Sequence, residues 1–107
     1  MLTEIWCNSG KEILLDLRTK AGADLSAQTF TMDVNPSGSA TPVFQVSSSY
    51  VGTVVVTGQT RYRFAFDYTL AQGEMLTLNA EYDLHVEKSA YQFGVDIPVK
   101  AVRNTGT

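Results

Sequence analysis

The segment from Arg61 to Tyr68 constrains the fold of this chain more than any other part of it. Aromatic residues occupy every second position, so that Tyr62, Phe64, Phe66 and Tyr68 alternate with Arg61, Arg63, Ala65 and Asp67. Because successive side chains of a β-strand point to opposite faces of its sheet, this pattern predicts a strand with one aromatic core face and one wet face. Long stretches with the 3.6-residue period of an amphipathic helix do not occur in the chain.

The same two-residue period recurs along most of the sequence. It predicts strands around residues 5–6 and at 13–17, 29–34, 43–46, 53–57, 61–68, 82–86 and 95–101, with one helical turn at 70–75. Valine, threonine and isoleucine make up 26 of the 107 residues, and these β-branched side chains suit a pleated, half-buried surface. Pro98 cannot donate a ladder hydrogen bond, so we expect the last strand at a sheet edge or at a bulge.

Short strands at a spacing of roughly ten residues are typical of an all-β domain built from two packed sheets. We therefore predict one domain over residues 1–107, an antiparallel β-sandwich of about seven strands with short N- and C-terminal extensions. A jelly roll or a small barrel is the alternative architecture.

An uncharged stretch runs from Val34 to Thr60, and its 27 residues include no Asp, Glu, Lys or Arg. Soluble sheets usually carry charges that block edge-to-edge pairing, so we expect part of this stretch in the core and part in a surface that another subunit covers. Three consecutive valines predict either burial on both faces or an exposed adhesive face. Together with a tryptophan ahead of the first clear strand, they give the candidate interface residues Trp6, Tyr50, Val54, Val55 and Val56.

The overall composition excludes several classes of function. The net charge of -3 leaves no basic excess for displacing counterions from phosphates, so we expect no nucleic-acid partner. The apolar runs are only a few residues long, so we expect no membrane partner. The single cysteine cannot form an intramolecular disulfide, which indicates a reducing compartment.

Residues for catalysis or metal binding are scarce. His85 alternates with Asp83 and Glu87 on one face, but transition-metal sites usually recruit several His or Cys residues, and the chain has one of each. Cys7 would need that same histidine as its base, so we interpret it as a small apolar residue beside Trp6. The sequence has no Gly-x-Ser-x-Gly motif, calcium loop or phosphate-binding glycine loop. We expect no enzymatic activity, no cofactor and no metal.

The segment Tyr82-Asp83-Leu84-His85-Val86 resembles the penultimate strand of immunoglobulin-like domains. In those domains a tyrosine near the start of the strand bonds back to the preceding corner, and Leu76 and Leu78 lie where that corner would be. The order of elements over residues 11–102 resembles small Ig-like virion proteins of tailed bacteriophages, which occur in tails, baseplates and capsid decoration. The chain departs from the usual pattern at Glu81, where a glycine is common, and it has no cysteine pair.

This resemblance implies an Ig-like sandwich that acts as a non-enzymatic structural protein of a phage particle. We expect a capsid decoration or cement protein, assembled in the bacterial cytoplasm and located in the virion. Its partners would be other virion proteins, such as the major capsid protein or tail proteins, and a homo-oligomer is a further expectation. The alternatives are a tail or baseplate subunit, and a module that recognises a glycan or peptide through loop aromatics such as Tyr50 and Tyr91.

Overall fold

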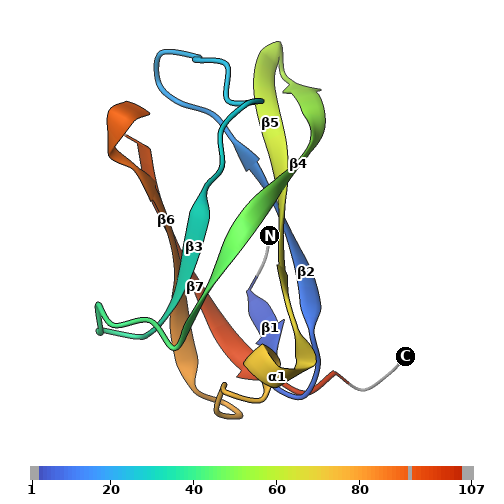
Figure 1. Ribbon diagram of the computed structural model, residues 1–107, viewed down its shortest axis with the longest axis vertical. Coiled ribbons are helices and arrows are strands. Elements are labelled where there is room, and N and C mark those ends of the chain that lie inside the picture. The colour runs from blue at the N-terminus through green and yellow to red at the C-terminus, as the bar shows by residue number, and fades with distance from the viewer. Residues whose placement is uncertain (1–2, 92, 105–107) are drawn as a thin grey trace.

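The computed structural model describes residues 3–91 and 93–104, and its regular structure is almost entirely β (Figure 1). The elements in chain order are β1 (Glu4–Trp6), β2 (Lys11–Leu17), β3 (Thr31–Pro36), β4 (Phe44–Val56), β5 (Gln59–Tyr68), α1 (Leu70–Gly73), β6 (Glu81–Lys88), a 3-10 turn (Ser89–Tyr91) and β7 (Phe93–Val102). Hydrogen-bonded neighbours follow the order β1-β7-β6-β3-β4-β5-β2.

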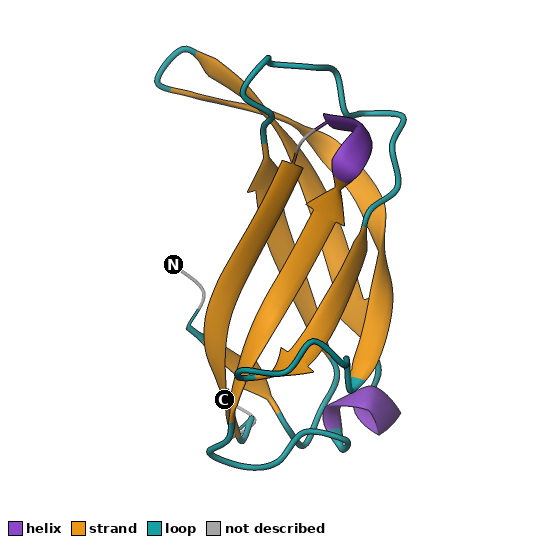
Figure 2. Ribbon diagram, turned by 90° about the vertical axis from the view of Figure 1, so that its left-hand side faces the viewer, coloured by secondary structure: helices purple, strands orange, loops and turns teal. Residues whose placement is uncertain are grey.

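The chain is an all-β, Ig-like sandwich, as the sequence predicts, and β4 belongs to both of its layers. One layer contains β1, β7, β6, β3 and the start of β4, and the other contains the rest of β4, β5 and β2. Figure 1 shows β4 in green, crossing diagonally from one layer to the other, and Figure 2 shows the strands from the side. Every pair of neighbouring strands is antiparallel except β1 with β7, which is parallel. The shared strand nearly closes the sandwich into a barrel.

A tyrosine corner stands where the sequence predicts it. The Tyr82 hydroxyl accepts a hydrogen bond of 2.8 Å from the backbone N–H of Thr77, five residues upstream, and the tyrosine side chain is buried. Leu76 is buried beneath this corner region, whereas Leu78 is exposed. The bond fixes the turn that leads into β6, as it does in other Ig-like domains.

The aromatic face of β5 forms the centre of the core. Phe64 and Phe66 are fully buried, and the Phe30 ring meets the Phe64 ring edge-on with their centroids 5.0 Å apart. On the opposite face, Ala65 is buried rather than wet, which corrects the prediction for that position. Ala65 has Leu14 of β2 and Ser49 of β4 as its register partners on either side, and its own small side chain is only 6% exposed.

The prediction of two separate strands at 43–46 and 53–57 is wrong, because β4 is continuous. The residues between these segments, 47–52, include no proline, and their one glycine, Gly52, lies at a register shift within the strand rather than in a turn. Ser48 instead bonds to Phe30 through both its backbone N–H (2.9 Å, donated to the Phe30 carbonyl) and its Oγ (2.8 Å, accepting from the Phe30 N–H). A register shift between Tyr50 and Gly52 then bends the strand into the second layer.

Candidate functional site

The predicted interface residues lie in two separate places. Tyr50 and the three valines belong to β4 and approach the tip of the β4–β5 hairpin, at the top of Figure 1. Trp6 is in β1, in the lower half of the same view. The structure therefore brings four of the five residues together and places the tryptophan elsewhere.

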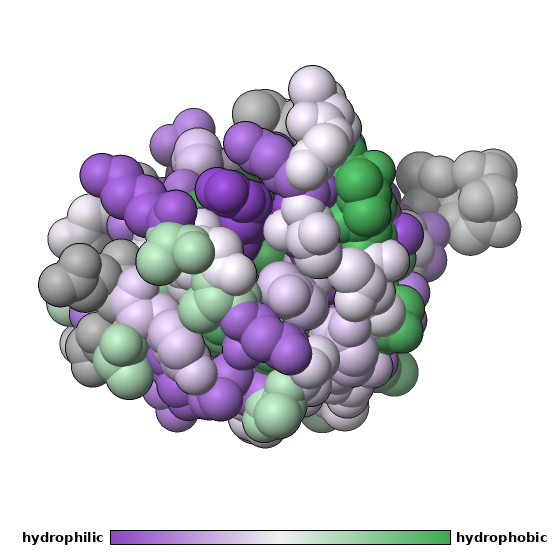
Figure 3. Space-filling view, turned by 90° about the horizontal axis from the view of Figure 1, so that it is seen from above, coloured by the Kyte–Doolittle hydropathy of each residue, from purple (hydrophilic) through white to green (hydrophobic). Residues whose placement is uncertain are grey.

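The β4–β5 hairpin exposes apolar side chains. The exposed fraction is 67% for Val55, 56% for Val51 and 41% for Val56, while Val54 is half-buried. Of the two expectations for the valine run, exposure is the one that the structure shows for Val55 and Val56, and adhesion to a partner stays a prediction. In Figure 2 the hairpin projects beyond the body of the sandwich, and the view onto this end in Figure 3 shows green hydrophobic side chains beside pale, weakly polar ones.

The valines lie where, among the described strands, β4 pairs with β5 alone. β3 pairs with β4 only as far as Ser47, so the first layer ends before the hairpin tip begins. Val55 and Val56 have only Thr60 and Gln59 of β5 as register partners. The pairing satisfies the backbone of the hairpin without burying its side chains.

A two-residue turn closes the hairpin. Thr57 has a φ of 52° and Gly58 a φ of 74°, and positive φ at both central residues is the mark of a type I′ turn. This turn matches the twist of paired strands, so it sets the register of the tip. Neither the turn nor Val51 was predicted from the sequence, because Thr-Gly is a weaker hairpin signal than Asn-Gly or Asp-Gly.

Trp6 is held through its backbone, while its indole stays half-buried. The Tyr68 hydroxyl accepts a bond from the Trp6 N–H and donates one to the Trp6 carbonyl, both at 2.7 Å. Burial raises the pKa of Tyr68 to about 12, so the hydroxyl stays protonated at neutral pH. Lys11 Nζ lies 4.2 Å from the centroid of the indole ring, and Ile5, rather than Trp6, fills the core beside it.

The outer face of β3, β6 and β7 carries a row of acidic side chains around the single histidine. His85 Nδ1 lies 2.6 Å from Asp96 Oδ1, and His85 Nε2 lies 3.1 Å from Glu87 Oε2. These two carboxylates, Asp96 first, raise the pKa of His85. Within residues 3–91 and 93–104, no three His, Cys, Asp or Glu side chains form a group that could hold a metal ion. The expectation of no metal site stays a prediction.

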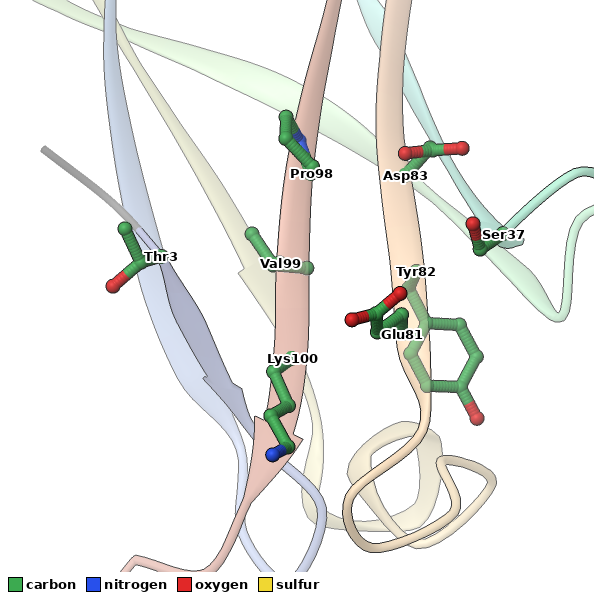
Figure 4. A pocket seen from close by; sticks show the side chains of 8 residues that line it. All are labelled: Thr3, Ser37, Glu81, Tyr82, Asp83, Pro98, Val99 and Lys100. Atoms are coloured by element: carbon green, nitrogen blue, oxygen red, sulfur yellow. The ribbon is translucent and has the colours of Figure 1, made fainter.

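His85 and Cys7 are the two residues that the sequence offered for catalysis. Both ring nitrogens of His85 bond to carboxylates, and Cys7 packs against the core. A cavity of about 220 Å³ lies between β6 and β7 and the loop after β3, and the described residues that line it are Thr3, Ser37, Glu81, Tyr82, Asp83, Pro98, Val99 and Lys100. Figure 4 shows Ser37 and Asp83 on its right-hand side, with neither a histidine nor a cysteine among the labelled side chains. This set offers the hydroxyls of Thr3, Ser37 and Tyr82, the carboxylates of Glu81 and Asp83, and the Lys100 ammonium, but no imidazole or thiol. The expectation of no enzymatic activity stays a prediction.

Comparison with known proteins gives no relative: no protein family, curated protein or solved structure matches the chain. Among the described residues, neither helical segment is long and apolar enough to cross a membrane. The fold and the exposed residues define a small Ig-like β-sandwich with a projecting hairpin whose tip is uncharged.

Proposed function

We propose that the protein is a non-enzymatic structural subunit of a larger particle and that the tip of the β4–β5 hairpin is its contact surface. The observation that carries this proposal is the exposure of Val51, Val55 and Val56 within a stretch that has no charge. Exposed apolar patches and strand edges without charges tend to associate with other proteins, and soluble proteins normally protect their edges with charged side chains.

The particle that we propose is the virion of a tailed bacteriophage, with capsid decoration as the role and other virion proteins as partners. The support is the layout of the sequence together with an Ig-like sandwich that has a tyrosine corner at Tyr82. A tail or baseplate subunit is the alternative within the same class.

Capsid decoration needs only modest affinity at each site. Burying one exposed valine fully stabilises a contact by roughly 1.5–3 kcal/mol before the cost of association is subtracted. A protein that binds only the assembled lattice stabilises it by mass action, and many equivalent sites add up across a shell. A small projecting tip is therefore sufficient for a cementing role.

Incorporation into purified particles tests this proposal. Val55→Lys places a charge at the most exposed valine of the hairpin, and we expect a folded protein that no longer enters particles. Met75→Lys is the matched control, because Met75 is also apolar and 57% exposed but lies just after α1, at the opposite end of the molecule (Figure 1). The control variant should enter particles like the wild type.

The proposal is wrong if both variants enter particles equally well, or if the wild-type protein associates with no particle or virion protein at all. Circular dichroism of the two variants confirms beforehand that each is folded. Loss of particle binding by both variants would also count against the hairpin, because it would point to a general effect of added positive charge.

A further inference from the structure

A groove runs between β2 and β7, the two strands whose edges face each other on the open side of the sandwich. It consists of two adjoining cavities of about 520 Å³ and 260 Å³, and Val95 of β7 lines both of them. Leu14 and Leu15 form the wall on the β2 side of the larger cavity, and Ile97 forms the wall on the β7 side. The larger cavity lies apart from the β4–β5 hairpin, whereas the smaller one reaches Gln59 and Arg61 of β5, next to the hairpin tip.

The edge of β7 along this groove has backbone groups that no described strand pairs with. β1 pairs with β7 only at Lys100–Val102. The Lys100 N–H donates to the Thr3 carbonyl on the side of β1, whereas the Ala101 N–H donates to the Ala80 carbonyl on the other side. Because the direction of these groups alternates along a strand, the N–H and C=O groups of Gly94 and Asp96 face the same side as those of Lys100.

The floor of the groove is apolar and has the spacing of a strand. Leu15, Val95 and Ile97 are half-buried and pack against the core, and Leu14 is 47% exposed at the rim. Inward-facing residues recur at every second position of β7, so an added strand would place alternate side chains on them. A strand of five or six residues, roughly 17–20 Å long, would cover β7 from Phe93 to Pro98.

The upper end of the groove carries two arginines, one of which has a donor without an acceptor. Arg18 and Arg61 line the smaller cavity together with Asp16 and Gln59. Asp16 does not serve Arg61, because it accepts two bonds of 2.7 and 3.1 Å from Arg63. The Nε of Arg61 is buried, and among the described residues it has no acceptor. A buried donor without a partner is costly, and a carboxylate brought by a ligand would satisfy it.

We propose that this groove binds an extended segment of a partner protein, which adds to β7 as a further strand in line with β1. The segment runs parallel to β7 and antiparallel to β2, as β1 does. Its alternate apolar side chains cover Leu15, Val95 and Ile97, and an acidic residue at its N-terminal end pairs with Arg61. This mode of binding is β-strand addition, in which backbone bonds supply affinity and alternate side chains supply specificity.

Binding in this groove goes beyond the proposed function, because the apolar floor lies on β2 and β7 rather than on the exposed valines of β4, and it holds whether or not the partner is a virion protein. Two features of the groove indicate the chemistry of the partner segment. The groove continues the pairing that β1 already makes with β7, and its charged end calls for an acidic group.

Titration with a blocked synthetic peptide, Glu-Val-Thr-Val-Thr-Lys, tests the proposal on the full chain. We expect saturable binding by calorimetry below 1 mM, with NMR shifts confined to residues that line the groove. A peptide of the same composition, Glu-Thr-Val-Thr-Val-Lys, presents its valines one position out of phase and should bind at least about tenfold more weakly, since a one-residue slip turns every side chain to the other face. Equal binding by the two peptides, or no saturable binding, overturns the proposal.

Two protein variants separate the parts of the groove. Leu14→Lys should weaken binding about tenfold. Leu78→Lys makes the same substitution at a similarly exposed leucine, on the corner before β6, and should leave binding unchanged. Arg61→Gln should abolish the preference for a peptide with Glu over one with Gln at the first position, which we expect to be about five- to tenfold in the wild type. If the preference survives in Arg61→Gln, the assignment of the acidic residue is wrong.

Analytical ultracentrifugation at the same protein concentrations tests whether a second copy of this chain occupies the groove instead. A wild-type protein that is monomeric without peptide and forms a one-to-one complex with it supports the proposal. A dimer that the peptide disperses would overturn it in favour of a second copy of this chain as the natural occupant.

Discussion

The two ends of β4 consist of the same kind of residue and lie in opposite environments. At the first end, Phe44 and Val46 are 8% and 7% exposed, while at the other end Val55 and Val56 are 67% and 41% exposed. Both ends are uncharged and strand-forming. The difference is that β3 and the opposite layer lie against the first end, and only β5 lies beside the second. Burial in this sandwich is decided by what stands across the layer rather than by the residues themselves.

The largest expected effect is at Phe64, which pairs in register with Tyr50 where the two ends of β4 meet. Phe64→Ala removes a fully buried ring that contacts the rings of Phe30 and Tyr50, and we expect a loss of about 3–5 kcal/mol in the free energy of unfolding. Chemical denaturation measures this loss. Arg63→Ala, on the opposite face, should cost much less, because the ion pair of Arg63 with Asp16 is open to solvent. Equal losses would mean that the inward and outward faces of β5 are assigned wrongly.

A matched pair of valines tests the comparison most directly. Val46→Ala removes two buried methyl groups, and we expect it to lower the free energy of unfolding by about 2 kcal/mol. Val55→Ala makes the same chemical change at an exposed position and should shift it by less than about 0.5 kcal/mol. Urea denaturation of both variants is the measurement. A loss at Val55 as large as that at Val46 would show that the hairpin tip is covered in solution.

The outer face of β6 is charged, in contrast to the tip of the β4–β5 hairpin, and the pH dependence of the free energy of unfolding tests that face. The pKa of His85 is raised in the folded protein by Asp96 and Glu87, so protonated His85 stabilises the fold below its ordinary pKa of about 6.5. That contribution is lost as the pH rises through the raised pKa. We expect a change of under about 1 kcal/mol, because both carboxylates are largely exposed.

The measurement for His85 is the free energy of unfolding at pH 5.5 and at pH 8.5, for the wild type and for His85→Gln. The part of the pH dependence that belongs to the histidine should disappear in the variant and shrink in 1 M salt. A variant with the wild-type pH dependence would rule out the two ion pairs as its source.

The smallest expected effect is at the tip of the hairpin. Thr57 has a φ of 52°, a left-handed conformation that β-branched residues rarely adopt and that asparagine tolerates well. Thr57→Asn should therefore raise the free energy of unfolding by about 0.5 kcal/mol, which a thermal melt can detect as a small increase in Tm. A decrease would indicate that the threonine methyl makes a contact that the turn geometry does not reveal.

The sequence predicted a residue's environment correctly wherever that environment follows from local properties of its own strand. The aromatic face of β5 follows from alternation alone, and the placement of Tyr82 at a corner follows from the resemblance of its segment to immunoglobulin-like domains. Pro98 also behaves as its chemistry predicts, since it lies along the part of β7 that β1 leaves unpaired. In each case the cause is local: the period of a strand, the position of a hydroxyl or the absence of an N–H.

The candidate sites depended on long-range pairing, and there the sequence failed or left alternatives open. It divided β4 into two strands, because the bonds that hold Ser48 come from Phe30, 18 residues away. It left the valine run either buried or exposed, since the end of β3 decides between them. It gave no sign of the groove, which exists because the edges of β2 and β7 meet across the sandwich.

The amino-acid sequence by itself determined that this protein is an all-β sandwich, which faces of its strands are apolar, and that a long segment of it carries no charge. Only the tertiary structure decided which apolar residues remain in contact with water, and that Arg61 has a buried N–H without an acceptor. The physical reason is that a strand's pattern fixes the direction of its side chains within the chain, whereas burial and hydrogen bonding require a partner whose position depends on the pairing of distant strands.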